Sequence, residues 1–176
     1  MPSFHHSDVE IAYLDEGDGE SIVLVHGFAS TASVNWVQPG WFATLTQDNR
    51  RVIALDNRGH GGSSKLASPA DYHTSLMAED VRALLDHLDL EMADVMGYSM
   101  GARITAFLAL AHPPRVRSAV FGGLGGNMVR PMAGTGPIAH ALEAKSIDDV
   151  VNPTARTFRA FAEKTGRESK ALAACI

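Results

Sequence analysis

The hydrophobic residues of this chain fall into two repeating patterns. Short continuous runs of β-branched and other apolar residues predict strands that are buried on both faces of a parallel sheet. Such runs occupy residues 21–25, 51–55, 93–98 and 116–122. A rougher alternation over residues 9–14, followed by a cluster of acidic residues and glycines, predicts an edge strand. The longer stretches between these runs predict helices over residues 35–46, 74–88 and 100–112.

The alternation of strands and helices predicts the fold class. It implies right-handed crossover connections and a mostly parallel, doubly wound α/β sheet with helices on both faces. In such folds, binding sites form where the carboxyl ends of the strands meet. Three glycine-containing segments, at residues 26–30, 56–64 and 97–101, each follow a predicted strand. We therefore expect these segments to converge on one site.

The character of the chain changes after residue 121. Residues 122–137 are rich in Gly, Pro and Met, which predicts a connection rather than core. Helices are expected over residues 138–145, from Pro153 to Gly166 with Asn152 as the N-cap, and over residues 168–175. The chain therefore divides into an α/β part over residues 1–126 and a helical part over residues 127–176.

The composition is that of an ordinary soluble globular domain. Of its 176 residues 45% are hydrophobic and 20% are charged, and the net charge of −5 without a basic cluster argues against nucleic-acid binding. The chain opens without a signal-peptide pattern and its apolar runs are too short to span a membrane, so we expect a cytoplasmic protein that does not bind membranes. The single cysteine, Cys175, excludes a disulfide framework. The sequence has neither metal-ligand spacing nor a dinucleotide or phosphate loop, so we expect no metal and no cofactor.

The segment with the most specific chemistry is Gly97-Tyr98-Ser99-Met100-Gly101. It matches Gly-x-Ser-x-Gly and stands between a predicted strand and a predicted helix, the context in which this motif forms a nucleophile elbow. Gly97 and Gly101 lack the Cβ atoms that would collide with the neighbouring strand and helix. Ser99 is then presented at the head of a helix, where free N–H groups favour developing negative charge. The alternative is that Ser99 only caps the helix.

Four segments together resemble the α/β-hydrolase superfamily. They are residues 23–28, 56–64, 97–102 and 112–116, and they follow the order and spacing of the family. The resemblance covers roughly residues 9–125 and is strongest to small esterases, enol-lactonases and cofactor-free haloperoxidase-like members. It implies an α/β-hydrolase sheet that lacks its last two strands within this chain, and the start of a helical cap over residues 127–176.

The resemblance also implies roles for individual residues near Ser99. The backbone amides of Phe28 and Met100 would form the oxyanion hole, and His26 and Gly27 would support the loop that carries Phe28. The resemblance likewise implies that the loop after the fourth family strand is held by Asp56, Arg58 and His60.

Two further residues are candidates for the wall of an apolar acyl pocket. They are Trp36, in the predicted helix after the first glycine-containing segment, and Met128, in the predicted cap. Core packing is the alternative explanation for both.

We therefore expect a serine hydrolase that cleaves a small-molecule ester, lactone or thioester through an acyl-serine intermediate. Family triads run in the order Ser, acid, His, and the last two follow later strands. We expect them in a C-terminal piece that this chain lacks, and we expect that piece or a partner chain to cover the open sheet edge. The alternatives are a catalytically inactive binding or regulatory protein, and a change of chemistry to perhydrolysis or carbon–carbon bond cleavage.

The remaining titratable residues are poor substitutes for the missing acid and base. His112 is expected about 20 Å along the helix from the serine, and His87 and Asp94 are expected at the far ends of their elements. His26 and His60 lie at the correct edge of the predicted sheet, so a general-base role for either stays open.

Overall fold

The computed structural model describes residues 1–126, 135–165 and 169–176, and within them the apolar runs form one six-stranded sheet. The strands are β1 (Ser3–His6), β2 (Val9–Glu16), β3 (Glu20–Val25), β4 (Arg50–Leu55), β5 (Ala93–Tyr98) and β6 (Val116–Gly122). Their order is β1-β2-β4-β3-β5-β6, with β1 and β2 antiparallel to their neighbours and the other four parallel to one another. The predicted α/β class and mostly parallel sheet are confirmed.

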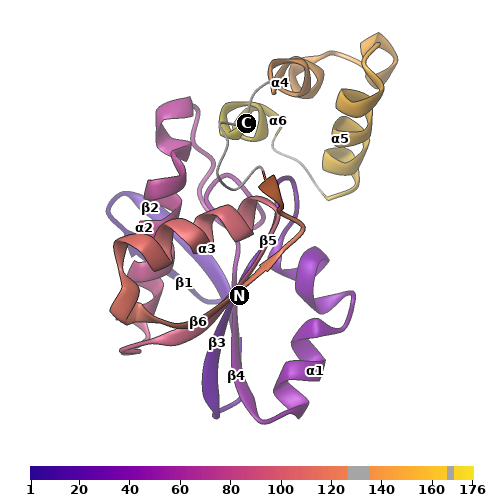
Figure 1. The fold of residues 1–176 in the computed structure, drawn as a ribbon. Helices are drawn as coiled ribbons and strands as arrows, with labels where there is room; N and C mark the ends of the chain where they lie inside the picture. The colour runs from indigo at the N-terminus through magenta and orange to yellow at the C-terminus, as the bar shows by residue number, and fades with distance from the viewer. Residues whose placement is uncertain (127–134, 166–168) are drawn as a thin grey trace.

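Helices cover both faces of this sheet (Figure 1). On one face lie α2 (Thr74–His87) and α3 (Met100–Ala111), and on the other lie a π-helix (Ser33–Val37) and α1 (Trp41–Gln47). Because successive side chains of a strand point to opposite faces, Val23 and Val25 of β3 join the core that includes α2 and α3. Ile22 and Leu24 join the core that includes Trp36 and Phe42. This burial on both faces explains why β3 is a continuous apolar run.

Two elements differ from the sequence prediction. The helix predicted over residues 35–46 is two short pieces, because Pro39 has no backbone N–H to donate and Gly40 adopts a φ of 89°. The strand β1 was not predicted, since its four residues Ser3–His6 include polar side chains and carry no apolar run. In contrast, the strand predicted over residues 93–98 and the start of the helix at Met100 are confirmed.

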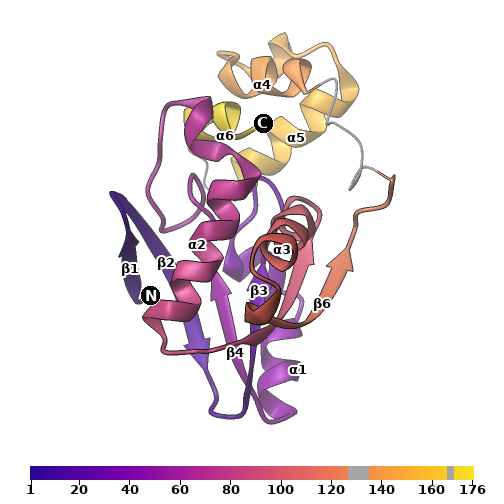
Figure 2. The same ribbon diagram turned by 60° about the vertical axis from the view of Figure 1, so that its left-hand side comes forward.

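Three helices near the C-terminal end of the described chain form a layer of their own (Figure 2). They are α4 (Gly136–Glu143), α5 (Pro153–Lys164) and α6 (Ser169–Cys175). Figure 2 shows them beyond the carboxyl ends of the parallel strands, where the family resemblance places the start of a cap. The predicted N-cap is confirmed, because the Asn152 Oδ1 atom accepts a hydrogen bond of 2.9 Å from the backbone N–H of Ala155. The domain boundary at residue 126 stays a prediction.

The helical layer is attached to the loop that follows β3. Leu142, Ala162 and Leu172 form a buried cluster with Ala29 of that loop, and the Thr165 hydroxyl donates a 2.6 Å hydrogen bond to the Ala29 carbonyl. Short 3₁₀ helices complete the described elements at Pro69–Tyr72, Pro113–Arg115 and Ile147–Asp149. In the described part of the chain, no helix has both the length and the apolar character needed to cross a membrane.

Candidate active site

Ser99 occupies a sharp turn between β5 and α3. The strand ends at Tyr98 and the helix begins at Met100, so Ser99 must reverse the chain within one residue. Its backbone has φ 52° and ψ −113°, a region that side-chain-bearing residues rarely adopt. The half-buried Ser99 side chain is consequently held at the head of α3. This backbone is the strained turn that the motif predicts.

The glycines of the motif are required by close packing. A Cβ atom on Gly97 would lie 2.2 Å from the carbonyl oxygen of Gly101, and one on Gly101 would lie 2.0 Å from the carbonyl oxygen of Val25. Both obstacles are backbone atoms, which a side-chain rotation cannot move. A Cβ atom on Gly27 would lie 3.4 Å from the Cβ atom of Ser99, so the loop after β3 passes directly beside the serine.

Two backbone N–H groups near Ser99 donate no hydrogen bond to any acceptor in the described chain. In the loop after β3, the N–H of Gly27 donates to the Asn35 Oδ1 atom and the N–H of Ala29 donates to the His60 Nε2 atom, both at 3.1 Å. The N–H of Phe28 between them has no acceptor among the residues that the structure describes, and neither has the N–H of Met100. These are the two amides that the sequence proposes as oxyanion donors.

Ser99, Phe28 and Met100 line one cavity of about 480 Å³. Apolar side chains from both layers make much of its wall, including Met77 of α2 and Phe158 of α5. Its size is within the range of small-molecule sites.

The prediction that Trp36 lines the pocket is wrong. The other predicted pocket residue, Met128, lies outside the described residues. Trp36 is only 2% exposed and packs with Ile22, Leu24 and Phe42 in the core beside α1, on the other side of β3 from the helix that carries the serine. Its indole therefore fills core volume instead of facing an acyl group. The core-packing alternative for Trp36 is the one that the structure supports.

A comparison with known protein families decides what this fold is. The family model described as "alpha/beta hydrolase fold" matches residues 20–141, which is more than half of the chain. The chain belongs to the α/β-hydrolase fold family. This confirms the resemblance inferred from the four sequence segments.

Relatives within the α/β-hydrolase fold family are mostly longer proteins. The 2-hydroxymuconate semialdehyde hydrolase of Pseudomonas sp. is 37% identical over 116 residues, which are 64% of this chain and 39% of that protein. The 3-oxoadipate enol-lactonase 2 of Acinetobacter baylyi is 31% identical over 128 residues, 68% of this chain and 46% of that protein. The solved structure of Est816, an N-acyl homoserine lactone degrading enzyme, is 26% identical with a TM-score of 0.75 and covers 97% of this chain and 69% of that chain. The chain thus spans less than half the length of these two curated relatives.

The two histidines at the serine edge of this α/β-hydrolase fold are held by backbone groups. The His26 Nε2 atom accepts from the backbone N–H of Asn57 at 2.9 Å, and its Nδ1 atom donates to the Gly27 carbonyl at 2.7 Å. The His60 Nε2 atom accepts from the N–H of Ala29, and its Nδ1 atom donates to the Arg58 carbonyl at 2.9 Å. Neither imidazole has a ring nitrogen left for a serine hydroxyl.

Burial also keeps these two imidazoles neutral. Loss of solvent lowers the pKa of His26 to about 4. Loss of solvent, with the nearby His26 ring adding to it, lowers the pKa of His60 to about 3. The rings meet edge to face, with centroids 5.1 Å apart. The supporting role that the family resemblance implies fits this geometry, and a general-base role for either does not.

Asp56 and Arg58 hold the loop after β4 from inside. The two carboxylate oxygens of Asp56 accept hydrogen bonds from the backbone N–H groups of Ala32 and Gly62, at 2.7 and 2.8 Å. The Arg58 guanidinium makes a two-pronged ion pair with Asp80 of α2, with distances of 2.6 and 2.7 Å. Because both ring nitrogens of His60 are bonded to backbone groups and neither contacts Asp56 or Ser99, the triad of Ser99, His60 and Asp56 does not form.

The other acid and base candidates lie away from the cavity, as expected. His112 pairs with Glu79, and His87 stacks on Phe4. Asp94 lies near the amino end of β5, where hydrogen bonds from Arg117 above all hold the pKa of its carboxyl well below its usual range. Residues 1–126, 135–165 and 169–176 contain no group of three side chains suited to a metal ion.

The sequence reasoning missed several residues of the cavity wall. Tyr72, Phe158 and Cys175 come from segments far from Ser99 in the chain, and no local pattern points to them. Burial raises the pKa of the Cys175 thiol to about 12, so it does not compete with Ser99 as a thiolate nucleophile. Arg103 was also missed, although its position four residues after the serine is a usable signal, since helical residues four apart share a face.

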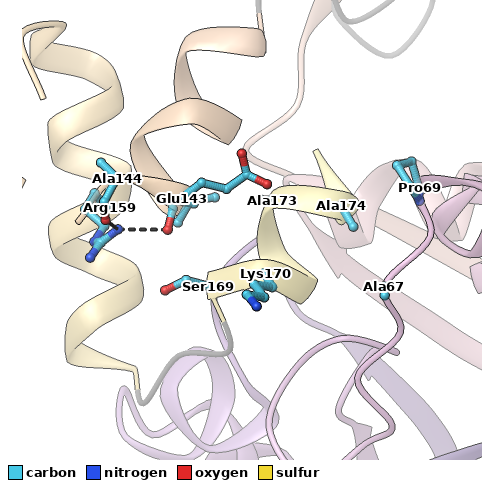
Figure 3. A pocket seen from close by; sticks show the side chains of 10 residues that line it. Ala67, Pro69, Glu143, Ala144, Arg159, Ser169, Lys170, Ala173 and Ala174 are labelled. Carbon is cyan, nitrogen blue, oxygen red and sulfur yellow. Dashed lines mark hydrogen bonds between the residues drawn. The ribbon is translucent and has the colours of Figure 1, made fainter. Parts of the chain in front are cut away.

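A second cavity of about 680 Å³ lies between the helical layer and residues 67–69 (Figure 3). Arg159 of α5 lines it and donates to the carbonyls of Ala141, Leu142 and Ala144 at 2.8–3.0 Å, so it caps the end of α4. The cavity is not lined by Ser99. Its arginine is already bonded to the Glu163 carboxylate and to these three carbonyl groups.

Proposed function

We propose that this protein is a serine hydrolase that cleaves a small-molecule carboxylic ester, lactone or thioester through an acyl-serine intermediate. One observation carries the proposal. A serine with a strained backbone, at φ 52°, opens into the same cavity as two residues whose backbone amides have no acceptor in the described chain. Strain of this kind persists only where the surrounding structure imposes it, as at nucleophile elbows.

The proposed reaction uses these groups in sequence. The Ser99 oxygen attacks the acyl carbon while a base takes its proton, and the amides of Phe28 and Met100 donate to the oxyanion that forms. The leaving alcohol or thiol accepts the proton as the acyl-serine forms. Water then attacks the acyl-serine with the same base and the same amides, and releases the acid. Each amide is worth about 100- to 1000-fold in turnover.

The base and its orienting acid are proposed to come from the part of the fold that follows residue 176. Family triads place the acid and then the histidine after the serine in the chain. The curated relatives are more than twice as long as the segment they share with this chain. The two histidines at the serine edge already serve the backbone, which supports a base from elsewhere.

The choice of an acyl substrate is supported by two relatives. One is named as an enol-lactonase and the other as an N-acyl homoserine lactone degrading enzyme, and both names describe lactones. The mostly apolar cavity wall around Ser99 suits the carbon chain of such a substrate.

Covalent labelling of the whole protein tests the proposal. A fluorophosphonate probe should modify Ser99, as located by peptide mass spectrometry, because the probe reacts with activated serines. Ser99→Ala should abolish the labelling and lower turnover of p-nitrophenyl esters by at least about 1000-fold. Ser118→Ala is the matched control, since Ser118 lies on β6 beside Asp94. A folded protein that neither labels at Ser99 nor hydrolyses esters would refute the proposal.

The second candidate is a binding or regulatory protein with the same cavity and no catalysis. The observation that favours it is the engagement of both ring nitrogens in His26 and His60. Under this alternative, Ser99→Ala leaves the affinity for small acyl ligands intact and the unmodified protein shows no ester turnover above that of buffer.

A further inference from the structure

The guanidinium of Arg103 lies at the Ser99 cavity without a carboxylate partner among the described residues. Arg103 lies on α3 four residues after the serine and lines the same cavity as Ser99, Phe28 and Met100. Its Nε and Nη1 atoms are shielded from solvent and have no hydrogen-bond partner in the part of the chain that the structure describes. Its Cζ atom lies 5.9 Å from the centroid of the Phe107 ring, which is not a hydrogen-bond acceptor of the usual kind.

Arg103 differs in this respect from the other arginines that the structure describes. Each of those pairs with a carboxylate, and they are Arg50, Arg51, Arg58, Arg82, Arg115, Arg117, Arg156 and Arg159. Even Arg159, which lines the second cavity (Figure 3), is bonded to Glu163 and to backbone carbonyls. Among the described arginines, Arg103 at the candidate active site is therefore the one without a carboxylate partner.

Arg103 is half-buried as a residue, but two of its guanidinium nitrogens are buried without an acceptor in the described chain. Leaving a buried donor without an acceptor is costly, and more so for a charged donor than for a neutral one. These nitrogens are therefore expected to receive an acceptor from a ligand. The planar guanidinium presents paired N–H groups whose spacing matches the two oxygens of a carboxylate. A carboxylate is thus the ligand group that best completes Arg103.

We propose that Arg103 binds a carboxylate of the substrate, so that the substrate is an ester or lactone that carries a free acid group. This inference rests on the proposed function for its identification of the reacting end. Arg103 lies four positions after Ser99, which corresponds to a rise of about 6 Å along one face of the helix. A substrate whose acyl carbon lies at Ser99 would therefore carry the carboxylate that binds Arg103 only a few bonds away from that carbon. Monoesters and lactones of short dicarboxylic acids have this form.

The test compares two ligands that differ only in charge. Monomethyl adipate carries one ester and one carboxylate, and dimethyl adipate is its neutral counterpart. Binding is measured by calorimetry on the whole protein carrying Ser99→Ala, which keeps both esters intact. We expect monomethyl adipate to bind about 10- to 100-fold more tightly, the range for a hydrogen bond to a charged partner. Arg103→Met should bring the two dissociation constants to within about threefold.

Two further variants complete the comparison. Arg156→Met is the matched control, because Arg156 is a half-exposed arginine that pairs with Asp148 on the helical layer, and it should keep the full preference. Arg103→Lys retains the charge without the fork, and should lose most of the preference if the geometry of the contact matters. It replaces Arg103→Met if circular dichroism shows that the methionine variant is unfolded.

Three results would overturn the inference: equal affinity for the two esters, a preference that survives in both Arg103 variants, or no binding of either ester. The proposed hydrolase activity fails separately, on the absence of fluorophosphonate labelling at Ser99. A carboxylate preference without labelling would keep the Arg103 site and remove the catalytic role.

Discussion

At the scale of single residues, the site depends on positions that have no room for a side chain. Ser99 holds a backbone conformation that costs energy, and the surrounding glycines allow three backbone segments to meet beside it. An added Cβ atom at Gly97 or Gly101 would lie too close to backbone atoms for any side chain to fit at either position. The motif is therefore a packing requirement as well as a chemical one.

Gly101→Ala tests this requirement. The new Cβ atom would lie 2.0 Å from the Val25 carbonyl oxygen, so β3 and α3 must separate. We expect the free energy of unfolding to fall by about 1–3 kcal/mol or more, with loss of labelling at Ser99. Denaturant titration followed by circular dichroism measures the change. Gly125→Ala, at a glycine with nothing within 4 Å of an added Cβ atom, is the control and should stay within about 0.5 kcal/mol of the original.

At the scale of elements, two buried imidazoles hold two loops together. One loop follows β4 and covers residues 56–64, and the other follows β3. His26 reaches from one loop to the Asn57 amide, and His60 reaches back to the Ala29 amide. This reciprocal pair fixes the loop that carries Phe28. The Phe28 amide, which we propose as an oxyanion donor, is thus positioned by two neutral histidines whose ring nitrogens are bonded to the backbone.

These imidazoles should make stability depend on pH. Both pKa values lie below the ordinary 6.5, at about 4 and about 3, because burial disfavours the charged rings. Below pH 6.5 the unfolded chain therefore binds protons that the folded chain excludes. Stability is complete above pH 6.5 and falls as the pH decreases toward 4, by about 1.4 kcal/mol per pH unit for each histidine.

Urea titrations at pH 7 and pH 5 measure this effect. We expect a clearly lower free energy of unfolding at pH 5. His60→Gln removes one of the two titrations, so it should weaken the pH dependence while lowering stability at pH 7. Equal stability at the two pH values would contradict neutral burial of the pair.

At the scale of the whole molecule, the cavity exists because two layers meet. The sheet edge contributes Ser99 and Phe28, and the helical layer contributes Phe158 and Cys175. On the opposite side of the molecule from β1, strand β6 pairs only with β5 among the described strands. Val120 and Phe121 of β6 are 50% and 41% exposed, so this edge presents apolar side chains beside free backbone groups.

This edge should drive association of the 176-residue chain when it is expressed by itself. An exposed apolar edge strand pairs readily with another strand. Val120→Lys places a charge on the edge and should weaken self-association by about tenfold, or about 1.4 kcal/mol, as measured by sedimentation velocity over a concentration series. Val151→Lys, at a position 93% exposed before α5, is the control and should leave association unchanged. A monomer at all concentrations would contradict the prediction.

Most of the fold was predictable because its signals are local. The strands β3 to β6 and the helices α2 and α3 follow runs and periodicities of fewer than fifteen residues, and burial on two faces produces those runs directly. The strand β1 escaped prediction because its stability comes from pairing with Val9–Glu16 and not from its own composition. The break between the π-helix and α1 depends on the conformation of Gly40, which apolar periodicity does not record.

By itself, the sequence determined the α/β alternation, the strained turn at Ser99 and the two amides beside it, because each follows from residues a few positions apart. Only the tertiary structure decided what surrounds the serine. It placed Trp36 in the core and Phe158 at the cavity, and among the described arginines it left Arg103 without a carboxylate. Those outcomes depend on contacts between segments distant in the chain, and a local pattern holds no information about which distant side chain will meet it.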